Sequence, residues 1–490
     1  MRIRGDLLSW IACLFLAAVS IAVSWGFGGK ASWVPEFIHR AGFVGAALLG
    51  WRVWLDFGKK PRRVSVGFLL ALASWIGLLW VFRDMMSRWL IELLEDGFSL
   101  NGISHFTPAS ADMDRTRKLI PLFQGQLMLA LVAGYCLRVR TAIRVLLGLL
   151  GANALVHAVI GGIFHFTMPG QLLGMIPAAN RMHFGAFHYH NHWGGFALLG
   201  AAILFALGAQ SWVVKRKVGG KGNPTLFYLV GGILVALMLP LGGGRTSSLM
   251  LLCLLVGAVA LFVGIGARGG SRTKVGVSLV IGFLALASLV FAISYYGGED
   301  LEARAKDGGE KIESVLESGL EADGRMVIME AAWLLYDMRP GFGWGLGGFY
   351  PMSPVFVGPD QWGRPRRAFY AHNDYLQLLC EIGWIGTSLL LIVPIGFGIY
   401  CAHWGKGNHL SRFLALGVAS ILVMACYEFP FGNPAIVSVF VVVYGVSGRY
   451  ALLEASGSGS GSRSRPRKSR KSSGSSGSKR DRTRNRTRSS

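Results

Sequence analysis

The chain has 490 residues, of which 52% are hydrophobic and 15% are charged. Soluble proteins carry about 25% charged residues, so this composition excludes an ordinary soluble protein and indicates one large domain of membrane helices. The net charge is +23, and residues 457–490 supply +11 of it through twelve Lys/Arg residues against one acid, Asp481. We predict that residues 455–490 form a disordered basic tail, because they contain no large apolar side chain to bury. Its expected partner is the layer of membrane lipid headgroups, and no nucleic acid is expected.

Apolar runs long enough to cross a bilayer recur throughout residues 1–454. The first, from Leu7 to about Phe27, is too long for a signal-peptide core, so we interpret it as a retained helix. The further runs centre on residues 41–57, 64–82, 119–137, 143–165, 193–213, 226–241, 247–267, 275–296, 376–401, 412–427 and 435–452. Together they predict an all-α membrane domain with about twelve transmembrane helices.

The charges of the connecting segments predict an orientation. With a cytoplasmic N-terminus, the cytoplasmic connections are all basic, and they read GKKPRR, RVRTAIR, KRKVGGKGNP, RGGSRTK, HWGKGNHLSR and the tail. The positive-inside rule therefore places both termini in the cytoplasm. The longest exterior loop covers about residues 297–375.

Histidines gather in the exterior stretch RMHFGAFHYHNHWGGF, residues 181–196. His183, His188, His190 and His192 invite a zinc site, but their spacing fits no known site and no acid or cysteine completes the set. Polar packing or hydrogen bonding to a glycan is the alternative, and we expect no metal. Arg181 is a lone cation at the mouth of a helix.

Two more exterior arginines stand in distinctive surroundings. Arg245, in LGGGRTSSL, lies between two apolar runs, where a charge is unfavourable unless it is paired or faces water. It is therefore a functional candidate, with snorkelling to the interface as the alternative. Arg325 lies in the first turn of a short amphipathic helix that we expect to end before Pro340. The glycine-rich string after that helix predicts a tight turn against the membrane domain.

A polar cluster precedes the apolar run that ends at Tyr400. Asp374 and Gln377, three residues apart, predict a helix N-cap with a capping-box partner. His372 would then lie at the mouth of a membrane helix, where an imidazole suits a general base or acid. The alternative is a histidine that only bonds a neighbouring loop. Just before it, Arg364, Arg366 and Arg367 form a basic patch that would meet either phosphate or lipid headgroups.

The string H-N-D-Y-L-Q-x-x-x-E-x-G-x-x-G, residues 372–386, is similar to the signature of the O-antigen ligase and polymerase superfamily. These are integral membrane glycosyltransferases that take glycans from polyprenyl diphosphate carriers, and the resemblance extends from about Arg181 to Gly386. It implies a GT-C-like glycosyltransferase architecture in a bacterial inner membrane, with no cofactor.

The resemblance also implies roles for individual residues. Arg181 matches the arginine before a G-x-F segment, Arg245 the arginine that opens the next exterior turn, and Arg325 the arginine of the loop helix. His372 matches the histidine of the final motif. Family members often carry N-x-N after G-x-F, and here only the second asparagine is kept, as Asn191.

These observations lead to a hypothesis of metal-independent, inverting glycosyl transfer. An acceptor hydroxyl attacks the anomeric carbon of an undecaprenyl diphosphate-linked glycan. Arg245 and Arg325, with Arg181, hold the diphosphate, since a guanidinium presents a permanently charged fork of donors to phosphate. His372 orients or deprotonates the acceptor. The remaining expected substrate-binding or supporting residues are Asn191, Arg367, Asn373, Asp374 and Glu381.

The acceptor is left open by the sequence. A ligase would use lipid A core or protein, as in lipopolysaccharide assembly, and a polymerase would use a growing glycan. A flippase or exporter of lipid-linked glycan is the alternative from another class, and it would need polar residues along a path through both leaflets. A purely structural scaffold would leave the exterior ionisable residues without a role.

Overall fold

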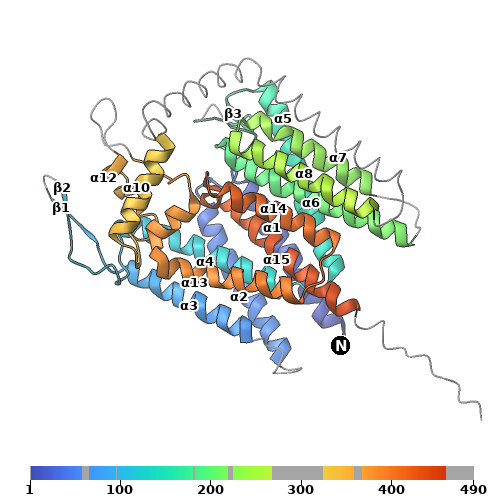
Figure 1. The fold of residues 1–490 in the computed structure, drawn as a ribbon, viewed down its shortest axis with the longest axis horizontal. Helices are drawn as coiled ribbons and strands as arrows, with labels where there is room; N and C mark the ends of the chain where they lie inside the picture. Colours follow the sequence, from blue (N-terminus) through green and yellow to red (C-terminus); the bar gives the residue numbers. More distant parts are fainter. Residues whose placement is uncertain are drawn as a thin grey trace, which may run out of the picture.

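Long α-helices form most of the computed structural model, which describes residues 2–57, 66–94, 97–179, 183–218, 224–267, 324–357 and 367–458 (Figure 1). The helices are α1 (Arg2–Trp25), α2 (Val34–Phe57), α3 (Val66–Met85), α4 (Met113–Tyr135), α5 (Arg140–Thr167), α6 (His190–Val218), α7 (Thr225–Met238), α8 (Arg245–Ala267), α10 (Gly324–Met338), α11 (Phe349–Met352), α12 (Pro354–Val357), α13 (Asp374–Trp404), α14 (His409–Met424) and α15 (Pro434–Ser458). Two short hairpins pair β1 (Ile91–Leu94) with β2 (Gly97–Leu100) and β3 (Gln171–Leu172) with β4 (Ile176–Pro177). Short 3₁₀ turns, η2 (Pro240–Gly242) and η4 (Pro430–Gly432), precede α8 and α15.

Seven helices in the described residues are long and apolar enough to cross a membrane. They are α1, α5, α6, α7 with the turn after it, α8, α13 and α15. The all-α membrane fold predicted from the sequence is confirmed at this level. Helices α2, α3, α4 and α14 lie at four further predicted runs but outside that set of seven. The predicted run at 275–296 lies outside the described residues, and so does the basic tail beyond Ser458, where α15 ends.

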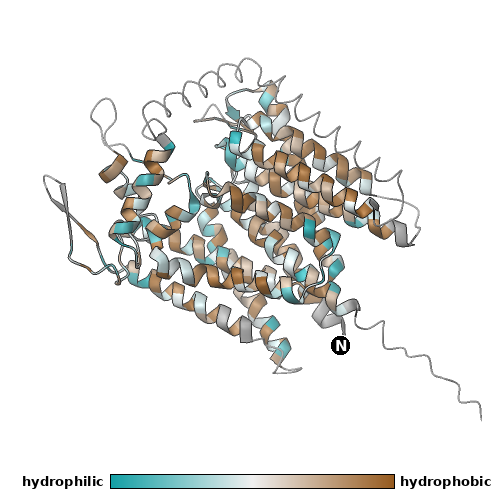
Figure 2. Cartoon of the chain, in the orientation of Figure 1, coloured by the Kyte–Doolittle hydropathy of each residue, from teal (hydrophilic) through white to brown (hydrophobic). Residues whose placement is uncertain are grey.

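Helix α6 is the centre of the core. It packs against α5, α7, α8 and α14, and 72% of its apolar span is buried. Its close approach to α8 requires a residue without a side chain, since a Cβ built on Gly194 would lie 2.2 Å from the Cβ of Ser247. Outside the core, apolar residues cover the helix surfaces and hydrophilic residues gather at the helix ends (Figure 2). Large side chains such as Phe43, Trp80 and Leu226 are exposed there, as expected of a surface that faces lipid.

The bundle has two chemically distinct ends. At the glutamate end, which contains Glu428, Asn433 donates to the Gly28 carbonyl at 2.8 Å and joins the α14–α15 connection to the α1–α2 connection. At the arginine end, which contains Arg52 and Arg138, Arg138 meets the C-terminal part of α2. Helix α2 runs between them, and its 24 residues span about 36 Å, enough to cross a bilayer core.

Helix α13 is broken at Gly383, and the glycine-rich loop after α10 fills the break. Gly383 has φ 66° and ψ −178°, so the helical hydrogen bonds are interrupted there. Trp344 N donates to Cys380 O at 2.9 Å, and Trp384 N donates to Pro340 O at 2.8 Å. The loop thus satisfies backbone groups that the break releases, as a low-dielectric environment requires. The predicted end of α10 before Pro340 and the predicted turn against the membrane domain are both confirmed.

One sequence prediction at the start of α13 is wrong. The N-cap is Asn373, whose side chain accepts from the backbone N–H groups of Tyr375 and Leu376 at 3.0 Å each. Asp374 is the first helical residue, and Gln377 donates to Glu381 rather than completing a capping box. Asn and Asp are equally good N-caps, so the sequence H-N-D did not distinguish them.

We predict that Gly383→Ala lowers the free energy of unfolding by about 1–3 kcal/mol, because its positive φ disfavours a Cβ. That Cβ would also lie 2.1 Å from Gly341 O. Gly396→Ala is the matched control, since Gly396 lies in the same helix with nothing within 4 Å of its built Cβ. Thermal unfolding of both variants in detergent measures the difference. Equal melting temperatures would contradict a structural role for the break.

Candidate functional site

A buried carboxylate organises the glutamate end. Glu428 lies between α14 and α15, and its side chain is 0% exposed. Its Oε1 is 3.0 Å from Nη2 of Arg325, and its Oε2 accepts a hydrogen bond from the Tyr189 hydroxyl at 3.0 Å. Nδ1 of His372 lies 3.7 Å from Oε2. One acid therefore joins the loop before α6, the first turn of α10 and the loop before α13.

The network continues to the beginning of α8. Asn191 donates to the Tyr189 hydroxyl at 3.4 Å, and Ser247 donates to the Asn191 side-chain oxygen at 3.2 Å. Arg245 is the first residue of α8, two residues before Ser247, and it is exposed. The start of α8 is thus held beside the Glu428 cluster, with the guanidinium of Arg245 accessible to solvent or ligand.

Phe429 is the centre of an aromatic cluster next to Glu428. It stacks on Tyr370 with ring centroids 4.2 Å apart and on Tyr189 with centroids 5.0 Å apart. His372 meets the same ring edge-on at 5.1 Å. Lys30, from the α1–α2 connection, donates to the Tyr370 hydroxyl at 3.0 Å. These contacts fix the ring of His372 and the loop that carries Glu428. Lys30 adds a positive charge next to the cluster.

The backbone at His372 adopts a left-handed conformation, with φ 52°. Such a conformation is uncommon for residues other than glycine and persists where the surroundings enforce it. Two residues on, Asp374 anchors this segment to the α14–α15 connection, because its carboxylate accepts from Phe431 N at 2.8 Å and its own N–H donates to Ala425 O at 2.9 Å. The result is that the His372 imidazole faces Glu428.

The electrostatics of Glu428 favour the charged form. Burial alone would raise the pKa of its carboxyl, but the neighbouring His372 and the charge of Arg325 outweigh that effect and lower the pKa below the usual range. The carboxylate is therefore ionised at neutral pH. Burial, and then the charge of Glu428, raise the pKa of the Tyr189 phenol, so Tyr189 stays protonated and donates its hydrogen bond.

The structure brings several of the predicted site residues together. Arg325, His372 and Asn191 belong to the Glu428 network, Arg245 lies beside it, and Asn373 and Asp374 build the start of α13 that carries the His372 loop.

Two other predicted residues lie in different surroundings. Glu381 is buried in α13, where it accepts from Gly347 N at 2.8 Å and from Gln377 at 3.0 Å and so holds the glycine-rich loop. Arg367 lies over the ring of Tyr350 at 5.7 Å. Arg181, Arg364 and Arg366 lie outside the described residues.

Sequence reasoning missed Glu428, Tyr189 and Lys30. Of the three, only Glu428 had a usable sequence signal. It is an acid between an apolar helix and the turn FPFGNP, and an ionisable residue at the membrane edge is a functional candidate. Tyr189 stands where family members often carry the first asparagine of N-x-N, and Lys30 lies in a loop that gave no motif. Each is recognised by its partners rather than by its sequence context.

The histidines of the 181–196 stretch each have contacts of their own. His183 contacts the Gln171 carbonyl at 3.2 Å, His188 lies edge-on to Phe27, and His190 lies beside Tyr189. Within the ranges that the structure describes, no group of three or more His, Cys, Asp or Glu side chains is placed to hold a metal ion. The described contacts of these histidines are with backbone and aromatic groups.

A family model described as O-Antigen ligase matches residues 230–391. Over these residues the chain is similar to an O-antigen ligase domain. The match confirms the resemblance to the O-antigen ligase and polymerase superfamily and includes Arg245, Arg325 and His372. Asn191 and Glu428 lie outside it and are added to the site by the fold. No curated protein matches the chain.

This match supports an enzyme of the ligase or polymerase kind that works on lipid-linked glycans. The seven apolar helices agree with a multi-pass membrane protein.

We predict that Glu428→Gln lowers the free energy of unfolding by about 1–2 kcal/mol at pH 7, because it removes a charged partner from Arg325 and His372. A lowered pKa means that this stabilisation is present above the ordinary glutamate value, about 4.3, and is lost as the pH falls through the folded value. The difference in melting temperature between wild type and variant should therefore shrink below about pH 4.

Glu330→Gln, on the exposed surface of α10, is the matched control and should leave the melting temperature unchanged at both pH values. A Glu428→Gln protein as stable as wild type at pH 7 would show that the carboxylate does not hold the cluster together.

Proposed function

We propose that this protein transfers a glycan from undecaprenyl diphosphate to an acceptor on the exterior, periplasmic face of the bacterial inner membrane, as an O-antigen ligase-like enzyme. The observation that carries the proposal is the Glu428 carboxylate, which holds Arg325 at 3.0 Å and His372 at 3.7 Å beside the exposed Arg245. Phosphate-binding cations and a proton acceptor thus meet at one end of an apolar helix bundle.

Arg245 and Arg325 form the donor side of this site. The side chain of Arg325 is 45% exposed, so its guanidinium group is accessible from solvent as well as in contact with Glu428. As the glycosidic bond breaks, negative charge grows on the diphosphate oxygen, and fixed guanidinium groups stabilise that charge more than they stabilise the bound substrate. Two guanidinium groups supply the charge that a divalent ion would otherwise supply, so the proposed reaction uses no metal or other cofactor.

His372 serves the acceptor side. Its Nδ1 faces Glu428, which leaves Nε2 to take the proton from an acceptor hydroxyl. The contact of 3.7 Å is longer than a hydrogen bond, and catalytic contacts of this kind commonly shorten when substrate binds. The carboxylate then stabilises the imidazolium that forms.

The proposed step is a single displacement. The acceptor oxygen bonds to the anomeric carbon, the bond from that carbon to the phosphate oxygen breaks, and its electron pair leaves with undecaprenyl diphosphate. The hydroxyl proton moves to His372. Attack from the face opposite the leaving group inverts the anomeric configuration, so a product of inverted configuration is the expected stereochemical outcome.

The alternative functions differ in the acceptor or in the class of activity. A polymerase of the same superfamily would use a growing glycan where a ligase uses lipid A core or protein. A lipid-linked glycan exporter would need polar groups between the two ends of the bundle. The span of α6 from Trp193 to Ala209, between those ends, is uniformly buried and apolar, which favours the enzyme.

We predict that Arg245→Ala, Arg325→Ala and His372→Ala each lower transfer by about 100-fold or more, while the proteins still insert into the membrane. The measurement is the surface glycan of a deletion strain complemented with each variant, together with the accumulated lipid-linked glycan. Full-length lipid-linked chains indicate a ligase, and single repeat units indicate a polymerase.

Arg40→Ala is the control, because Arg40 is an exposed arginine in the half of α2 nearer the glutamate end and pairs only with Glu36 in the described residues. It should complement fully. Full complementation by the Arg245 and His372 variants would instead exclude the proposed chemistry and favour transport.

A further inference from the structure

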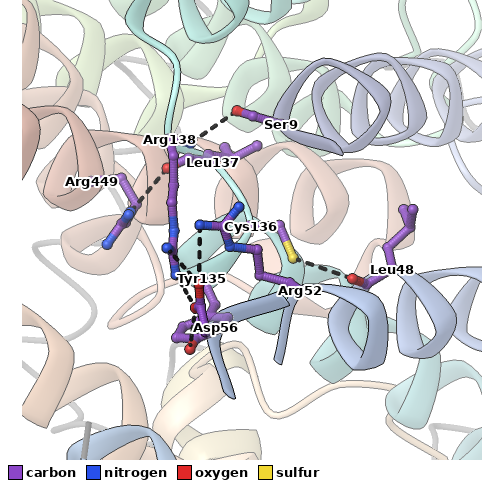
Figure 3. A network of polar contacts seen from close by, with 9 residues as sticks. All are labelled: Ser9, Leu48, Arg52, Asp56, Tyr135, Cys136, Leu137, Arg138 and Arg449. Carbon is purple, nitrogen blue, oxygen red and sulfur yellow. Dashed lines mark hydrogen bonds and ion pairs between the residues drawn. The ribbon is translucent and has the colours of Figure 1, made fainter. Parts of the chain in front are cut away.

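A second polar cluster lies at the arginine end of the bundle, where α2 meets the connection between α4 and α5 (Figure 3). Arg138 makes two contacts with the Asp56 carboxylate, at 3.0 and 2.6 Å, and Arg52 approaches it at 3.3 Å. Tyr135 donates to the same carboxylate at 2.9 Å. Arg449, from α15, donates to the Leu137 carbonyl at 3.0 Å.

This cluster has an excess of positive charge. Arg52, Arg138 and Arg449 are close enough for their charges to repel one another, and among the described residues Asp56 is the one carboxylate that forms ion pairs within the cluster. Arginine does not lose its proton in proteins, so the cluster cannot neutralise itself by titration. Buried charges need partners, and about two positive charges here lack a counter-charge among the described residues.

Arg52 is the arginine whose buried charge most clearly needs a further hydrogen-bonding partner. Its side chain is 8% exposed, and its Nε makes no hydrogen bond within the described part of the chain. Arginines that act only as topology signals lie in water, where their charge is solvated. The neighbouring Arg138 side chain is 28% exposed, so the cluster is open to the outside on that side.

The surroundings place the cluster at the depth of lipid headgroups. Trp51, Trp54 and Phe57 flank Arg52 on α2 and are 40%, 70% and 51% exposed. Exposed tryptophans at a helix end mark the membrane–water interface. Arg52 is 18 residues from the start of α2 at Val34, which is about 27 Å along the helix axis and puts it in the leaflet opposite the glutamate end.

We propose that Arg52, Arg138 and Arg449 form a binding site for the phosphate group of an anionic phospholipid, in the leaflet opposite the Glu428 site. A phosphodiester supplies the missing negative charge and accepts from several guanidinium donors at once. Basic sites between membrane helices bind anionic headgroups in this way. The bound lipid would join the ends of α2, α4 and α15.

The test uses the full chain, purified in neutral detergent, with phosphatidylglycerol or phosphatidylcholine added at equal mole fraction. We expect phosphatidylglycerol to raise the melting temperature of the wild type relative to phosphatidylcholine. Arg52→Gln should lose most of that rise yet remain as stable as wild type in phosphatidylcholine, because Asp56 keeps its contacts with Arg138 and Tyr135.

Arg412→Gln is the matched control, since Arg412 is exposed on α14 near the same end. Arg412→Gln should keep the rise in melting temperature with phosphatidylglycerol. The basic tail is present in every protein compared, so its effect is the same in all of them. Arg449→Gln is a second variant that removes a charge without touching Asp56 and should also lose the rise. It decides the question if Arg52→Gln does not fold.

Sodium phosphate compared with sodium chloride at equal ionic strength separates the two sources of the ligand. If phosphatidylglycerol raises the melting temperature in an Arg52-dependent way and free phosphate does not, the lipid site is supported. If free phosphate reproduces the whole rise in melting temperature, the site binds the free ion. An equal rise in wild type, Arg52→Gln and Arg449→Gln would overturn the proposal, as would an equal loss in Arg412→Gln.

Discussion

The glutamate end depends on one requirement, that a carboxylate with no exposed surface must have charged or hydrogen-bonding partners. Glu428 meets it with Arg325, Tyr189 and His372, which come from segments far apart in the sequence. Removing one partner would leave a buried charge uncompensated, so the three segments are held together more strongly than their number of contacts suggests. In the same geometry the side chains of Arg325 and His372 keep exposed fractions of 45% and 22%.

A second constraint, which does not involve Glu428, positions Arg325 and His372. Backbone groups in an apolar environment must be satisfied, and the break of α13 at Gly383 releases several of them. The loop from Pro340 to Gly347 pairs with those groups, and Glu381 adds a hydrogen bond to Gly347. Since α10 leads directly into this loop and α13 follows directly after His372, the docking fixes how Arg325 and His372 lie relative to each other.

The sequence predicted the elements better than their contacts. Hydropathy and length located the apolar helices, because both are local properties of the chain, and the motif at residues 372–386 identified the superfamily. The site was predicted in part: Arg325, His372 and Asn191 are in one network, and Arg245 begins the adjacent helix. The position of Glu428 at the end of an apolar helix made it a candidate, but nothing in the sequence indicated its partners, of which the nearest along the chain, His372, is 56 residues away. Glu381 illustrates the reverse case, since its motif position suggested chemistry and its contacts are with a structural loop.

The two ends of the bundle handle buried charge differently, and the difference bears on what each end binds. At the glutamate end one carboxylate meets Arg325 and His372, so the buried charge is balanced and Arg245 remains outside it as an exposed cation. At the arginine end one carboxylate contacts two guanidinium groups, and Arg449 adds a third positive charge nearby, so the imbalance lies inside the cluster. A site that must release its product gains from an accessible charge, because binding through exposed groups is partly offset by lost hydration. A site with buried, unbalanced positive charge favours an anionic ligand that stays bound. An anionic lipid of the surrounding membrane is always present to supply the negative charge.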